Sequence, residues 1–290
     1  MSNGNSLINL GEISKPATVL VEKISDAVGG LFKPYQIRRV SEAEADAEII
    51  RAQAQIEITD LQRRAITRFI GEEAKKQKNM EDITNKAIPE LKEASTPGDV
   101  EDDWLTNFFD KCRIVSNDEM QSLWAKVLAG EANAPGTYSK RTVNFLGSLD
   151  RADAQLFSSL CGFGWMIGDV VPLVFDVEAQ IYNERQINFS TLTHLDAIGL
   201  VKFEPLGGYK RTKFSREVVL FYYGMFFTVE FHNEQDNNLK IGTVLLTQVG
   251  QQLAPICGSK QVDGFDDYVI AKWRNEGLII SSPYPPVKLN

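Results

Sequence analysis

Residues 41–76, SEAEADAEIIRAQAQIEITDLQRRAITRFIGEEAKK, carry an apolar pattern that repeats every eleven residues. Such a repeat corresponds to about 3.67 residues per turn, so it keeps one apolar stripe on one side of a nearly straight helix. Ser41 and Glu44 fit a capping box at its start, and no Gly or Pro interrupts it before Gly71. The stripe is narrow and rich in Ala, which favours close packing against another helix. We predict self-association through Ala47, Ile50, Ala54, Ile58, Leu61, Ala65 and Phe69.

The charges of this expected helix are divided between its two halves. Residues 41–60 contain six acidic residues and one basic residue, whereas residues 61–78 contain six basic and two acidic residues. This division suits the helix macrodipole. It also favours antiparallel or staggered pairing of two copies, with the acidic half of one against the basic half of the other. The alternative is a solvated face on a helix that packs within its own chain.

Composition points to a folded protein of ordinary character. The 290 residues suffice for two domains. The net charge of −8 argues against broad electrostatic binding of nucleic acid. Three well-separated cysteines without a CxxC motif fit a reducing cytoplasm, as small buried hydrophobic residues. We also expect no signal peptide and no membrane-spanning segment.

Residues 14–32 are predicted to form a short amphipathic helix, with Ser14 as its cap and Pro16 in its first turn. Two interpretations remain open. The helix docks on the body of the protein, or it lies in a membrane interface as part of a peripheral membrane protein. In the second case the residues that contact the membrane are Leu20, Ile24, Val28, Leu31 and Phe32.

The middle of the chain is expected to be helical. Asn79 is a candidate cap for a further helix that Pro89 ends or kinks. The sequence Ser95-Thr-Pro-Gly98 indicates a loop and a domain boundary. Helices are then expected after Ser116, which forms a capping box with Glu119, and after two further caps, Ser139 and Asp150.

From residue 170 onward the pattern changes to short strands with helices between them. Helix caps are expected at Ser190 and Thr247. The order helix, strand, turn, strands and helix over residues 188–257 resembles a winged-helix module. The predicted fold is therefore mainly α with a C-terminal α+β module: a long N-terminal helix, a helical middle domain and a winged-helix-like C-terminal domain. The expected segments are residues 1–36, 37–95, 99–175 and 176–290.

Three segments together resemble a known family. They are LGEISKPATVLVEKISDAVGGLFKP (10–34), IVSNDEMQSLWAKVLAGEANAPGTYSKRTVNFL (114–146), and LTHLDAIGLV with LLTQVGQQL downstream. They resemble an uncharacterised bacterial family of unknown function that is similar to abortive-infection proteins found among anti-phage genes. The resemblance implies a bacterial protein of the cytoplasm or membrane surface, with a role in phage defence and a phage or host protein as partner. It transfers no catalytic residue.

Motifs for chemistry are weak. His194 and His232 are the only histidines, and neither lies in a cluster typical of metal ligands. Nothing in the spacing supports a nucleophilic pair of Cys161 with His194. The acidic pairs at 102–103 and 266–267 stand near expected helix starts, where acids are favoured. The glycines of GFGWMIG (162–168) follow a helix rather than a strand, which is the wrong order for a dinucleotide site. We therefore predict no enzyme activity, no metal and no cofactor.

A local basic cluster offers a second candidate function. Lys210, Arg211, Lys213 and Arg216 could contact phosphates of a nucleic acid, although the preceding helix offers no Arg or Lys to base edges. The alternative is a winged-helix shape used for packing or protein contact. The aromatic run at residues 221–231 is interpreted as sheet core, with an aromatic partner surface as the alternative. The preferred prediction is a non-enzymatic protein that forms a homo-oligomer through its long helix.

Overall fold

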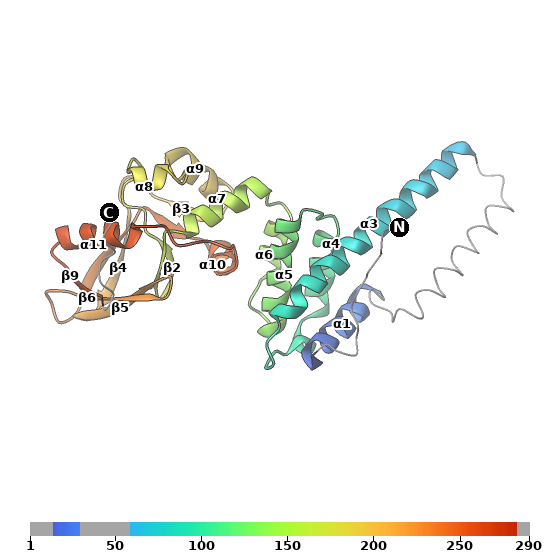
Figure 1. Ribbon diagram of the computed structural model, residues 1–290, viewed down its shortest axis with the longest axis horizontal. Coiled ribbons are helices and arrows are strands. Elements are labelled where there is room, and N and C mark those ends of the chain that lie inside the picture. The colour runs from blue at the N-terminus through green and yellow to red at the C-terminus, as the bar shows by residue number, and fades with distance from the viewer. Residues whose placement is uncertain (1–13, 30–58, 283–290) are drawn as a thin grey trace. The chain divides into compact units, whose positions relative to one another are not determined.

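The computed structural model describes residues 14–29 and 59–282, and the chain divides into two compact units, residues 1–148 and 149–290. The loop at residues 95–98 lies inside the first unit, and residues 175–176 lie inside the second. The two units are described separately below, with the labels of Figure 1. As expected, the chain is mainly helical, with small antiparallel sheets in its C-terminal half.

The first unit is built from helices. Its elements are α1 (Lys15–Val28), α3 (Asp60–Ala87), the 3-10 turns η1 (Ile88–Glu90) and η2 (Pro97–Asp99), α4 (Asp102–Cys112), α5 (Asp118–Asn133) and α6 (Lys140–Leu146). Aromatic rings on α4 and α5 form its core. Phe108 stacks at 5.1 Å on Trp104 and meets Trp124 edge-on at 5.1 Å. The indole of Trp104 donates a hydrogen bond of 2.7 Å to the carbonyl of Tyr138, so this buried N–H is satisfied.

Helix α3 differs from the sequence prediction at both ends of the expected long helix. The prediction of one uninterrupted helix over 41–76 is wrong, because Thr59 is an extended N-cap (ψ 156°) from which α3 starts afresh. Residues 41–58, including the expected Ser41 cap, lie outside the described residues. The prediction that Asn79 caps a new helix is also wrong, because α3 continues through it to Ala87. Pro89 does end the helix and opens η1.

Helix α1 docks on its own unit. Its apolar face is buried at Ala17, Leu20, Val21 and Ile24, and the helix packs against α4. An ion pair of 2.7 Å joins Lys23 to Asp102 at the edge of this contact. Gly29 ends the helix in a left-handed conformation (φ 84°).

Other helix starts match in part. Ser139 and Thr247 cap α6 and α10 as expected, accepting hydrogen bonds from Thr142 and Gly250. Two caps were misplaced. Asn117, not Ser116, caps α5, and Asn188, not Ser190, caps α9 in a capping box with Thr191. Asn117 directly follows the expected Ser116, and Asn188 stands two residues before the expected Ser190. Each Asn side chain accepts a hydrogen bond from the third backbone N–H of its helix.

The second unit combines helices with three sheets. Its helices are α7 (Arg151–Cys161), α8 (Gln180–Asn183), α9 (Phe189–Ala197), α10 (Gln248–Leu253) and α11 (Phe265–Asn275). Its strands are β1 (Gly164–Ile167), β2 (Asp169–Pro172), β3 (Val201–Phe203), β4 (Tyr209–Phe214), β5 (Glu217–Tyr222), β6 (Met225–Glu230), β7 (Asn237–Gly242), β8 (Val244–Leu246) and β9 (Ile279–Ser281).

The strands pair antiparallel. The largest sheet has the order β2-β1-β5-β6-β9, and β3 pairs with β8 and β4 with β7 in two-stranded sheets. The expected strand at 240–246 is divided at Gly242 (φ 87°), where any side chain would collide with the carbonyl of Val174. Trp165 fills the core of this unit, with Tyr222, Phe227 and Trp273 within 5.3 Å of its ring centre.

Docking of α1 can be tested by truncating one buried side chain. Ile24→Ala removes a fully buried side chain and is expected to lower the free energy of unfolding by about 2–4 kcal/mol. Glu22→Ala, at an exposed position of the same helix, should change it by about 0.5 kcal/mol or less. Urea denaturation followed by tryptophan fluorescence measures both. Equal stability of the two variants would show that α1 does not dock.

Candidate functional site

The N-terminal half of α3 is a helix with no neighbour on any side among the described residues. Every residue from Asp60 to Lys75 is exposed, and Figure 1 shows this half extending beyond the other helices of its unit. At 1.5 Å per residue these sixteen residues span about 24 Å. We refer to residues 60–75 of α3 as the free half of α3.

Large apolar side chains cover one side of the free half. Leu61 is 68% exposed, Phe69 63%, Ile70 45% and Ile66 39%. Leu61, Ala65 and Phe69 of the predicted self-association stripe are exposed on the free half. The other predicted residues, Ala47, Ile50, Ala54 and Ile58, lie outside the described residues. The eleven-residue repeat missed Ile66 and Ile70, which the ordinary i, i+4 spacing of a helix would have added. Exposed apolar side chains gathered on one element are typical of a contact surface.

The start of the free half is fixed by its own sequence. The hydroxyl of Thr59 accepts a hydrogen bond from the backbone of Gln62, and the Gln62 side chain accepts one of 2.9 Å from the backbone of Thr59. Asp60 adds a negative charge in the first turn, where the helix dipole favours it. The spacing Thr-x-x-Gln is a capping box that could have been recognised in the sequence.

Charged side chains surround the apolar stripe. Arg64 pairs with Asp60 at 3.4 Å, Arg68 with Glu72 at 3.6 Å and Lys76 with Glu73 at 2.6 Å. All are local pairs on an exposed helix, which contribute little to stability. Residues 60–78 contain six basic and three acidic residues, so the helix is basic around its apolar stripe.

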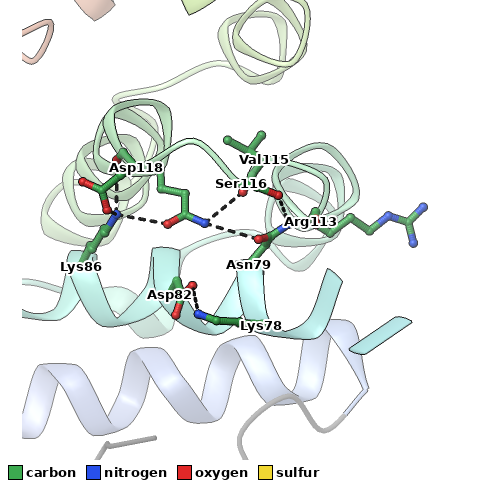
Figure 2. A network of polar contacts seen from close by, with 9 residues as sticks. Lys78, Asn79, Asp82, Lys86, Arg113, Val115, Ser116 and Asp118 are labelled. Carbon is green, nitrogen blue, oxygen red and sulfur yellow. Dashed lines mark hydrogen bonds and ion pairs between the residues drawn. The ribbon is translucent and has the colours of Figure 1, made fainter. Parts of the chain in front are cut away.

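The second half of α3 is held by a buried polar network (Figure 2). The amide of Asn79 donates 2.8 Å to the carbonyl of Arg113 and 3.3 Å to the hydroxyl of Ser116. The Gln121 amide donates 3.0 Å to the Val115 carbonyl. The two Asn79 bonds tie α3 to the loop between α4 and α5, and the Gln121 bond ties α5 to the same loop. They satisfy backbone groups of that loop.

Lys86, further toward the C-terminal end of α3, completes the network. Its ammonium donates 2.5 Å to the Asp118 carboxylate and 3.1 Å to the Gln121 side chain. Ile83 and Ala87, on the same part of α3, are fully buried where α3 packs against α5. The second half of α3 is therefore a fixed base from which the free half extends.

Comparison with known protein families identifies the chain. Residues 63–270 match a family described as "Protein of unknown function (DUF2806)". The chain belongs to the DUF2806 family. No curated protein and no solved structure matches it. The match includes most of α3 and ends within α11, and it carries no statement about activity or about phage defence.

The basic cluster expected to contact nucleic acid is partly neutralised in the DUF2806 chain. Arg211 pairs with Asp169 at 2.8 Å, and Arg216 pairs with Glu230 at 3.0 Å and Glu234 at 2.8 Å. Lys210 and Lys213 lie on β4 with exposed side chains. Two of the four predicted residues are thus committed to acidic partners in their own unit, which weakens the case for a phosphate-binding surface.

The expected membrane-contact residues divide in a similar way. Leu20 and Ile24 are fully buried under α4, so they are not accessible to a bilayer in this arrangement. Val28 is half-buried, and Leu31 and Phe32 lie outside the described residues. Among residues 14–29 and 59–282, no helix combines the length and the apolar character needed to cross a membrane.

The aromatic run at residues 221–231 proves to be both core and surface. Because side chains of a strand alternate between faces, Tyr222 and Phe227 are buried while Phe221 and Phe226 are 46% and 39% exposed. Phe221 stands opposite Phe226 on β6 and Met166 on β1, so the sheet presents an apolar row across three strands.

The remaining candidates for chemistry lie apart or have structural partners. His194 lies 2.7 Å from Asp153, and no group of metal-ligating side chains occurs in the described part of the chain. Asp102 and Asp266 stand in the first turns of α4 and α11, as expected for acids at helix starts. Cys161, which was considered with His194, instead has Cys257 beside it, a pairing that the sequence analysis missed.

The role of the polar network as an anchor can be measured. Asn79→Ala leaves the Arg113 carbonyl and the Ser116 hydroxyl without their partner, and should lower the free energy of unfolding by about 1–3 kcal/mol. Lys78→Ala removes only the exposed pair with Asp82 and should cost about 0.5 kcal/mol or less. Chemical denaturation of both variants tests this, and a neutral Asn79→Ala would contradict the anchor.

Proposed function

We propose that this DUF2806 chain is a non-enzymatic assembly protein that associates with a second copy of itself through the free half of α3. The observation that carries this proposal is the exposure of four large apolar side chains, Leu61, Ile66, Phe69 and Ile70, on a helix whose other half is firmly anchored. A rigid base lowers the entropy cost of presenting such a surface to a partner.

Charge supports a second copy as the partner. Residues 60–78 are basic, whereas residues 41–58 of the sequence contain five acidic residues and one Arg. Each copy thus carries both a basic helix and an acidic segment patterned with Ala and Ile. The acidic segment of one copy complements the basic helix of the other, which favours association in this register over pairing of two basic helices.

Three further roles remain hypotheses with less support. A part in anti-phage defence, with a phage or host protein as partner in the bacterial cytoplasm, rests on the family resemblance of three sequence segments. A winged-helix use of the second unit rests on the β3–β8 pair, since α9 comes directly before β3 and α10 directly after β8 along the chain. A membrane-peripheral role rests on the amphipathic pattern of α1.

Association can be tested by charge insertion at an exposed apolar position. Phe69→Glu places a charge in the proposed contact and should weaken association at least about thirtyfold, as expected for the loss of an interface aromatic worth about 2 kcal/mol. Thr67→Glu adds the same charge on the opposite side of the free half and should associate like the wild type. Sedimentation velocity over a concentration series measures both, and circular dichroism confirms that the variants are folded.

Two outcomes would contradict the proposal. A wild-type chain that stays monomeric throughout the series removes self-association altogether. If Phe69→Glu instead lowers the stability of a monomer, the stripe is covered by another part of the same chain.

A further inference from the structure

Two cysteines far apart in the sequence meet in the second unit. Cys161 is the last residue of α7, and Cys257 lies in the segment between α10 and α11. The Cys161 thiol is a hydrogen-bond partner of the Cys257 sulfur. Cys257 also donates 3.2 Å to the Ala254 carbonyl, and both thiols are free. An intrachain disulfide can form only between two thiols that lie close together.

Neighbouring contacts hold the two backbone segments together independently of the thiols. The hydroxyl of Tyr222 donates 2.9 Å to the Gly162 carbonyl and accepts 2.9 Å from the Val262 backbone. Gly162 approaches the Lys260 carbonyl so closely that a Cβ would lie 2.8 Å from it. The segment after α7 and the segment after α10 are therefore fixed side by side, which lowers the rearrangement needed to join their thiols.

A second tyrosine ties the same two segments at the protein surface. The Tyr223 hydroxyl donates 2.7 Å to the hydroxyl of Ser259 and lies 3.3 Å from the Cys161 carbonyl. Tyr223 is 40% exposed, and Gly258, next to Cys257, is also exposed. The thiol pair thus lies close beneath the surface, within reach of a small reagent.

The three cysteines of the chain differ in the state of their thiols. The hydrogen bond from Cys161, with further bonds from Ser259 and Ser158, lowers the pKa of Cys257 to about 7 against the opposing effect of desolvation. Desolvation raises the pKa of Cys161 and of Cys112 well above that of an ordinary thiol. Cys257 is half-buried, whereas the other two are buried. Only Cys257 combines access with the thiolate form, which is the reactive one.

We propose that Cys257 and Cys161 form an oxidation site at which a peroxide converts the two thiols into an intrachain disulfide. The Cys257 thiolate attacks the peroxide O–O bond, which gives a sulfenic acid and releases hydroxide, or alkoxide from an organic peroxide. The Cys161 thiol then attacks the sulfenic sulfur, the S–S bond forms and water leaves. The peroxide accepts the two electrons that the two thiols lose, so the reaction balances without another reductant or oxidant. The product links the end of α7 to the segment between α10 and α11.

This assignment differs from the expectation that all three cysteines are small hydrophobic core residues. That description fits Cys112, which is fully buried on α4. It does not fit Cys257, whose sulfur is surrounded by polar hydrogen-bond partners and which lies on a connecting segment rather than inside a helix. Cys112 therefore serves as an internal control in the same molecule.

Hydrogen peroxide titration of the folded full-length protein tests the site. After denaturation the count of free thiols should fall from three to one, and the protein mass should fall by two hydrogen atoms. Peptide mapping should find the Cys161–Cys257 disulfide, with Cys112 still reduced. Cys161→Ser should stop at a Cys257 sulfenic acid that dimedone traps, Cys257→Ser should protect both remaining thiols, and Cys112→Ser should behave as the wild type.

The wild-type measurement alone can overturn the proposal, so it does not depend on the folding of any variant. Oxidation of Cys112 as fast as Cys257, a disulfide between two chains, or three free thiols after treatment would each contradict the site.

Discussion

Burial of one half of α3, while its other half stays in solvent, is the constraint on which the account of this protein depends. A helix of this length gains little from propensity and local ion pairs, so packing must fix it. Ile83 and Ala87 supply that packing against α5, and the Asn79 and Gln121 amides satisfy backbone carbonyls in the α4–α5 loop. The direction of the free half follows from these contacts. The free half therefore holds its apolar side chains in solvent, which is typical of a surface that binds a partner.

Local sequence signals predicted the existence of helices better than the residues at which they begin and end. The apolar periodicity predicted one helix over residues 41–76, of which residues 60–76 belong to α3, but a repeat cannot indicate where a helix begins or ends. The Thr59-x-x-Gln62 capping box contained that information and was overlooked, because the residues before it carry the same pattern. Asn79 shows the opposite error. An Asn favours helix caps in general, yet here its amide has carbonyl and hydroxyl partners more than thirty residues away, so tertiary contacts retain it inside α3.

In the second unit the sequence predicted strands but not their partners. Alternation along β5 and β6 explains why the aromatic run divides into buried Tyr222 and Phe227 and exposed Phe221 and Phe226. Whether a face of the sheet is buried depends on the elements that pack against it, and the residue pattern of a strand does not identify those elements. The pairing of Cys161 with Cys257 was equally hidden, since it arises from the contact of two connecting segments that Tyr222 and Tyr223 hold together. No spacing rule in the sequence joins them.

The central claim is that a second copy covers the free half of α3 while the network around Asn79 holds the other half within its own chain. Hydrogen–deuterium exchange of the wild-type protein at low and high concentration tests both parts at once. We expect residues 79–87 to be protected at both concentrations, and residues 60–75 to gain protection only at the high one. Exchange of residues 60–75 that does not depend on concentration would contradict the account.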